Sequence, residues 1–269
     1  MKKKIAVAAL TGILTAGPVF ASGYRIPEQS LNATALSAAY IANTPNADAS
    51  YYNPANMSWL ENTWQTEASL TWIHLDSIEY TDNTTASRNS GSRNEDFAMP
   101  NLHVVSPEYN NFRFGLSVVY PYGLSKRWDN SFPKTTAEEF TLKTYELNPT
   151  ISYKINDKIS LGGGVRAMYA EGVVKSRGAV GPTTISRDMS GDTTEYGYNL
   201  ALTYRPVENL ALAATYRSKI DLDIEGDAHL TSSINGANYS GGTSVSVPAP
   251  AVLTLASAYT CNNGRTTAE

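Results

Sequence analysis

From Gln65 onward, apolar and polar residues alternate along most of the chain. The clearest example covers residues 112–120, where Arg113, Gly115 and Ser117 separate the apolar positions. A period of two is typical of β-strands that present one apolar face. The pattern predicts eight strands, at 65–75, 101–106, 112–120, 139–155, 159–175, 195–205, 210–222 and 245–259.

Short turns and long polar loops separate these strands alternately. The short turns are predicted at 107–111, 156–158 and 206–209, and the long loops at 76–96, 121–137, 176–193 and 226–244. In outer-membrane barrels the periplasmic turns are short and the external loops are long. The alternation therefore predicts an all-β fold, a transmembrane antiparallel β-barrel whose first strand rises from the periplasm. A secreted β-sandwich is the alternative, but strands of about ten or more residues favour the barrel.

In a barrel, the apolar face of each strand would meet lipid. Tyrosines stand near several strand ends, where a ring can be half apolar and half hydrated, at Tyr120, Tyr145, Tyr169, Tyr204 and Tyr259. In the strand at 210–222, the alternation places Ile220 and Leu222 on the same lipid-facing side as Leu210 and Leu212.

Residues 22–64 do not follow the period of a strand. Leu31, Ala35 and Ala39 give part of a helical pattern, after which asparagines and prolines interrupt both periods. We therefore expect compact irregular structure that plugs the lumen of the barrel. The predicted organisation is a signal peptide at 1–21, an N-terminal hatch or plug at 22–64 and barrel wall at 65–269.

The first 21 residues have the pattern of a secretion signal. Lys2, Lys3 and Lys4 precede an apolar run that ends in Val19, Phe20 and Ala21. Small residues at this point are typical of a cleavage site, so we expect cleavage after Ala21. An uncleaved anchor helix is the alternative, but the run is short for a membrane span and is interrupted by glycine and proline.

The composition fits a membrane barrel and disfavours several other classes of protein. The chain is 42% hydrophobic and 17% charged and contains 17 Tyr. A net charge of -4 without basic clusters disfavours nucleic acid as a partner. With one Cys and three separated His, the sequence gives no signature of a metal site, a cofactor site or a catalytic constellation. We therefore expect no enzyme activity.

Several short segments carry a resemblance to a known family. They are GYRIPEQS at 23–30, Asn53-Pro54-Ala55, PNLH at 100–103, YGL at 122–124 and TYRS at 215–218. Together, and in this order, they are similar to segments of the long-chain fatty acid transporter family of Gram-negative outer membranes (the FadL/OmpP1/TodX type). The similarity covers nearly all of the chain after the predicted signal.

The resemblance implies a barrel of about fourteen strands that is closed by an N-terminal hatch and acts as a monomer when complete. Long-chain fatty acids or similar hydrophobic compounds would enter through the lipopolysaccharide layer and bind in an apolar pocket. They would then leave sideways into the membrane lipid through a kink in the third strand. No cofactor is implied.

The resemblance also implies roles for particular residues. Tyr24 and Ile26 would contact the ligand, and Asn53, Pro54, Ala55 and Gly123 would form the hatch and its gate. The family's carboxylate-binding base falls on Ser176, so Lys175 or Arg177 would have to replace it.

About eight predicted strands are fewer than the family's barrel requires. An open sheet edge in lipid would leave backbone polar groups unpaired. We therefore expect the sequence to be part of a longer chain. Alternatives for its function are transport of aromatic hydrocarbons, a diffusion porin or an adhesin.

Overall fold

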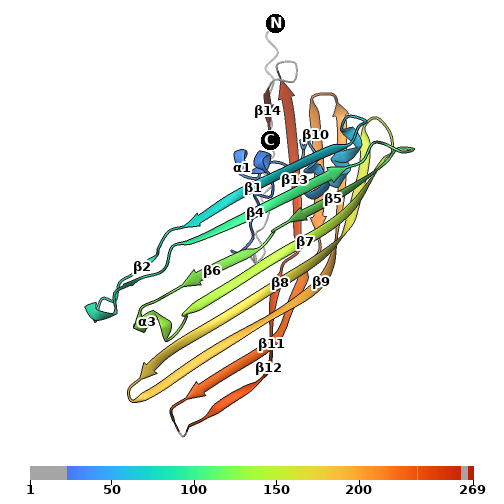
Figure 1. Ribbon diagram of the computed structural model, residues 1–269. Coiled ribbons are helices and arrows are strands. Elements are labelled where there is room, and N and C mark those ends of the chain that lie inside the picture. Colours follow the sequence, from blue (N-terminus) through green and yellow to red (C-terminus); the bar gives the residue numbers. More distant parts are fainter. Residues whose placement is uncertain (1–22, 235, 262–265) are drawn as a thin grey trace, which may run out of the picture.

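The computed structural model describes residues 23–234, 236–261 and 266–269, so the predicted signal peptide lies outside the described residues. The described residues form a long, twisted antiparallel sheet with short helices packed near one end (Figure 1). The strands are β1 (Gln65–Leu75), β2 (Glu79–Tyr80), β3 (Ser90–Gly91), β4 (Glu95–Val105), β5 (Phe112–Val119), β6 (Gly123–Arg127), β7 (Glu139–Lys154), β8 (Ile159–Val180), β9 (Thr183–Val207), β10 (Leu210–Arg217), β11 (Ile220–Ser232), β12 (Asn238–Ala249), β13 (Val252–Cys261) and β14 (Thr266–Ala268).

The order of strands follows the chain, as in an up-and-down barrel wall. The sheet runs β1-β4-β5-β7-β8-β9-β10-β13-β14, with β6 paired to β7 and β11 paired to both β9 and β12. Strands β2 and β3 form a separate small hairpin. The predicted all-β class and antiparallel order are confirmed, and the described strands form an open wall.

Two of the four predicted long loops are mostly strands. β8 and β9 are 22 and 25 residues long and meet at a tight turn where Gly181 has a φ of 62°. The expected loop at 176–193 is therefore wrong, and β11 and β12 likewise replace most of the expected loop at 226–244. About 9–11 residues suffice to cross the membrane, so polar strand ends continue beyond it. Alternation of apolar residues fails there because no lipid contacts those ends.

One predicted face is also wrong. The chain leaves the β10 strand at Ser218 and Lys219 and resumes in β11, which shifts the alternation by one residue. Ile220 and Leu222 are consequently buried on the inner face, whereas Leu212 remains exposed on the outer face. An irregularity of this kind reverses every side chain that follows it.

The outer face carries most of the exposed apolar side chains. Leu70, Trp72, Val165, Leu200 and Leu255 are all more than half exposed. In the described residues, no helix is both long enough and apolar enough to cross a membrane.

The N-terminal segment, residues 23–64, lies against the inner face of the sheet. It contains α1 (Leu31–Ala35), α2 (Ala49–Tyr52) and the 3-10 helix η1 (Pro54–Trp59); η2 (Ala86–Arg88) and α3 (Ser131–Lys134) lie at the other end of the wall (Figure 1). Each described helix of the segment is at most six residues long. The Arg113 guanidinium fixes the end of the segment by donating to the backbone carbonyls of Leu60 and Glu61 at 2.6 and 2.9 Å.

Candidate ligand path

The third strand of the wall is interrupted. β5 ends at Val119 and β6 begins at Gly123, and both pair with β7. On the other side, the β4 ladder to β5 extends only from Leu102 to Val105. Among the described residues, no ladder joins β4 to β6, which leaves an opening in the wall beside β6.

The start of the N-terminal segment binds the interrupted backbone. The amide of Ile26 donates to the carbonyl of Pro121 at 2.8 Å, and the amide of Gly123 donates to the carbonyl of Tyr24 at 2.9 Å. These bonds satisfy backbone groups that would otherwise lose their partners where the strand is broken. The structure therefore places Tyr24, Ile26 and Gly123 together at the break.

A cavity of about 490 Å³ lies in the wall opening, and we call it the wall cavity. Phe97, Ala98 and Met99 of β4 line one side, and Leu124 and Tyr145 line the other. Tyr24, Arg25 and Ile26 form part of its floor. This cavity connects the outer surface of the sheet with the N-terminal segment.

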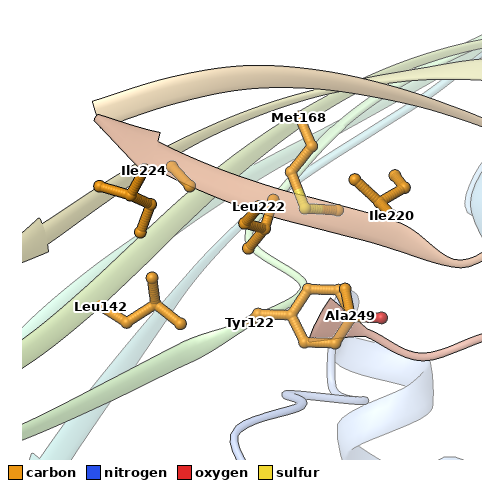
Figure 2. Packing of buried hydrophobic residues seen from close by; sticks show 8 residues of the cluster. Tyr122, Leu142, Met168, Ile220, Leu222, Ile224 and Ala249 are labelled. Carbon is orange, nitrogen blue, oxygen red and sulfur yellow. The ribbon is translucent and has the colours of Figure 1, made fainter. Parts of the chain in front are cut away.

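A second cavity, of about 170 Å³, lies on the inner face, and we call it the lumen cavity. Its lining is almost entirely apolar and includes Phe140, Val174, Met189, Ile224 and Val247. It borders a buried cluster in which Tyr122, Leu142 and Met168 point toward Ile220, Leu222 and Ile224 (Figure 2). The alternation in the sequence does not indicate this cluster, because it places Ile220 and Leu222 on the lipid-facing side.

Tyr24 belongs to the lining of both cavities. Its ring lies 5.6 Å from that of Tyr122, centroid to centroid, and its hydroxyl donates to the carbonyl of Pro248 in β12. Leu124 and Leu142 are also shared by the two linings. A small set of side chains thus separates a lumen pocket from an opening in the wall.

The predicted gate residues Asn53, Pro54 and Ala55 belong to the N-terminal segment and contact strands β8 and β9. The Asn53 amide donates to Thr203 Oγ1 at 3.0 Å, and the Ser160 hydroxyl donates to the carbonyl of Ala55 at 2.8 Å. A Cβ on Gly162 would lie only 2.4 Å from the backbone nitrogen of Ala55. These residues are in contact with the wall and lie apart from Gly123, which belongs to the wall cavity.

A buried charge cluster supports the middle of the N-terminal segment. Glu146 binds Arg166 at 2.8 Å and also binds Arg217. Arg217 in turn donates to the carbonyl of Tyr51 at 3.2 Å and lies 4.3 Å from the centre of its ring. Glu146 thus joins arginines of two different strands to the N-terminal segment.

Tyr52 connects this region to the start of the segment. Its hydroxyl donates to the carbonyl of Pro27 at 2.8 Å and accepts from the amide of Gln29 at 2.6 Å. Burial raises the pKa of the Tyr52 hydroxyl, so the phenol stays protonated in the folded protein.

The two predicted carboxylate-binding residues form ion pairs elsewhere. Lys175 pairs with Asp188 at 3.5 Å and Arg177 with Glu138 at 3.8 Å. Neither lines the wall cavity or the lumen cavity. Val174, which lines the lumen cavity, neighbours Lys175 in a strand where alternate residues face opposite sides.

Arg187 is a cation that sequence analysis did not single out. It is paired in register with Ser176, two residues from the Val174 and Met189 pair that lines the lumen cavity. Residues two apart on a strand share a face, so Arg187 lies on the inner face. Among the described residues, no carboxylate pairs with it, and its Nε has no hydrogen-bond partner.

Comparison with known proteins identifies the family. A family model described as "Outer membrane protein transport protein (OMPP1/FadL/TodX)" matches residues 12–263. The chain belongs to this family. The OMPP1/FadL/TodX family consists of outer-membrane proteins, which agrees with the predicted location, and the resemblance found in the sequence is confirmed.

Curated relatives match only part of their own length. A long-chain fatty acid transport protein of Escherichia coli O6:H1 is 28% identical over 161 residues, which cover 51% of this chain and 36% of that protein. Outer membrane protein P1 of Haemophilus influenzae is 24% identical over 156 residues, which cover 46% of this chain and 34% of that protein. The chain thus spans about a third of each of these OMPP1/FadL/TodX relatives.

Solved structures of the OMPP1/FadL/TodX family share the fold. A Pseudomonas aeruginosa FadL homologue has a TM-score of 0.74 at 20% identity, with 90% of this chain and 67% of that chain covered. The toluene transporter TodX of P. putida has a TM-score of 0.64 at 19% identity, with 81% of this chain and 63% of that chain covered.

Proposed function

We propose that the complete protein imports long-chain fatty acids or similar hydrophobic compounds across the outer membrane. The observation that carries this proposal is the position of Tyr24 between an apolar lumen cavity and a cavity in the open wall. Burying each CH₂ of an acyl chain contributes about 0.8 kcal/mol, so an apolar cavity can bind such a ligand without catalysis. Release through the wall opening would deliver it directly to lipid.

In this proposal residues 22–64 act as a hatch inside the barrel wall formed by residues 65–269, and movement of the strand at the start of the hatch acts as the gate. Tyr24 and Ile26 contact the ligand, Gly123 permits the break in the strand, and Asn53, Pro54 and Ala55 anchor the hatch on β8 and β9. Processing after Ala21 frees residue 22 as the mature N-terminus. Sequencing the N-terminus of the protein purified from outer membranes tests that cleavage.

The main test is uptake of labelled oleate by cells that lack their own importer. A complete version of the protein should restore uptake, and the Tyr24→Ala variant should alter it because the two cavities would merge. Tyr80→Ala serves as the matched control, since Tyr80 is an exposed tyrosine in the β2 hairpin. Uptake at background level with the unaltered, correctly inserted protein would refute the proposal.

Transport of aromatic hydrocarbons is the second candidate. It is favoured by the apolar lining of the lumen cavity, which would suit an uncharged ring as well as an acyl chain. A relative of known structure is named as a toluene transporter. Competition of toluene against labelled oleate in the same cells separates the two substrates.

We infer that the protein works as a monomer in outer-membrane lipid and lipopolysaccharide, without enzyme activity. Similar curated proteins named as long-chain fatty acid transport proteins support the absence of enzyme activity. An esterase assay and the native mass of the purified complete protein test it. Conductance measured in planar bilayers tests the porin alternative, and binding to host-cell surfaces tests the adhesin alternative.

A further inference from the structure

The wall opening has a defined frame. At its lower edge, the β4–β5 ladder begins with the pair Leu102 and Val118. At its upper edge, Ser92 bridges to Trp128, and the amide of Arg93 donates to the carbonyl of Arg127 at 2.8 Å. Between these edges, the described residues form no backbone ladder from β4 to β6, and side chains span the gap.

A cluster of polar side chains spans the upper part of this opening, and we call it the polar bridge. The Ser125 hydroxyl of β6 donates to Glu95 Oε2 of β4 at 2.6 Å. Arg127 Nε lies 3.6 Å from the same oxygen, and Arg127 Nη2 lies 2.9 Å from Glu139 Oε1 of β7. The hydroxyl of Thr141 lies 3.1 Å from that of Ser125. The bridge therefore links one side of the opening to the other.

The polar bridge is not an ordinary surface pair. The side chain of Glu95 is only 7% exposed, and Arg127 is 39% exposed. The second oxygen of Glu95 has no hydrogen-bond partner among the described residues. Two carboxylates share one guanidinium, so Arg127 of β6 is tied to both β4 and β7. Burying polar side chains costs free energy unless they are hydrogen-bonded or paired, and here the partners lie on different strands.

We propose that the polar bridge sets the size of the wall opening and thereby limits the cross-section of the ligand that can leave through it. The proposal rests on the proposed function, because it assumes release through the wall. Glu95 and Arg127 are positioning residues here: they hold β4 against β6 above the cavity, while the apolar residues below them contact the ligand.

The test compares a slim and a bulky ligand in the uptake assay. The variants Glu95→Gln and Arg127→Gln each remove the charge pairing, and Glu95→Gln does so without a change in side-chain size. We expect each variant to raise the ratio of uptake of a fatty acid carrying a terminal pyrene to uptake of oleate by about fivefold. A partly exposed ion pair contributes a free energy that corresponds to a change of this order. Lys134→Gln is the matched control, because its pair with Glu138 does not cross the opening. An unchanged ratio in both variants would overturn the proposal.

A distance measurement tests the polar bridge independently of transport. Spin labels at Ala98 and Lys143, placed in a Cys261→Ser background, report the width of the wall cavity from its two sides. Arg127→Gln should lengthen and broaden the distance distribution, and Lys134→Gln should not. Lengthening without any uptake by the unaltered protein would refute the proposed function and leave the polar bridge standing. An unaltered distribution would refute the polar bridge itself.

Discussion

The side-chain amide of Gln29 pairs with the backbone of Tyr120 in the way a neighbouring strand would. Gln29 Oε1 accepts from the Tyr120 amide at 2.7 Å, and Gln29 Nε2 donates to the Tyr120 carbonyl at 2.9 Å. The pair lies where β5 ends, so one side chain of the N-terminal segment replaces the missing backbone partner of the wall. Docking of the segment and interruption of the strand are therefore one structural feature.

Gln29→Ala should loosen both the segment and the broken strand. Leaving the partly buried backbone groups of Tyr120 unpaired costs up to about 1–3 kcal/mol. Hydrogen exchange at residues 24–29 and 120–123 should become faster. Gln65→Ala is the control, since the Gln65 amide makes an exposed bond to Thr63. Equal protection in both variants would contradict the role assigned to Gln29.

Gly162→Ala should displace the turn formed by Asn53, Pro54 and Ala55. The added Cβ would meet backbone atoms at 2.4–2.5 Å, and overpacking of this kind costs about 1–3 kcal/mol. Denaturant unfolding in detergent should show the loss, and a protease should cut the N-terminal segment sooner. Gly91→Ala adds a Cβ with no atom within 4 Å and should change neither measurement.

Glu146→Gln should be among the most damaging charge substitutions. It leaves Arg166 and Arg217 buried without their carboxylate, which costs about 3–5 kcal/mol for a buried pair. The measurement is the free energy of unfolding of each variant relative to that of the unaltered protein. The exposed pair of Lys219 and Asp221 is the control, and Lys219→Met should change stability by less than about 1 kcal/mol. A loss of similar size in both variants would contradict the buried role.

Arg187→Gln should lower uptake of an anionic fatty acid more than that of an uncharged hydrocarbon. A charge-assisted hydrogen bond to a carboxylate contributes about 1.5–3 kcal/mol, so a loss of about tenfold is expected for oleate. In the same assay, Lys175→Gln and Arg177→Gln test the prediction from the sequence that one of these two residues binds the carboxylate. A larger loss in either of those variants would assign the carboxylate to that residue instead.

High pH should release the start of the N-terminal segment through Tyr52. Because the pKa of Tyr52 is raised in the folded state, its contribution to stability is fully present below the ordinary tyrosine pKa of about 10 and declines above it. Difference absorbance between the wild type and Tyr52→Phe should show no tyrosinate from Tyr52 near pH 10. Titration of Tyr52 at the ordinary pH would contradict its buried hydrogen bonding.

The sequence by itself determined the class of the fold, because a period of two and a rhythm of turns are local properties. It located β1, β5 and β7 closely and gave the turn at Asn110 and Asn111, whose positive φ values of 50° and 68° suit asparagine. Through a family resemblance it also singled out Tyr24, Ile26 and Gly123, but the structure is what brings these three residues together at the break in the wall.

The tertiary structure alone decided which residues of the wall line the two cavities. The shift after Arg217 turned Ile220 and Leu222 from lipid to lumen, and pairing across strands brought Arg187 opposite Ser176. The polar bridge joins Glu95 to Arg127, 32 positions later in the chain, and no sequence period links them. Alternation specifies a strand and its two faces, whereas register, bulges and breaks arise from packing between strands, which a local pattern does not contain.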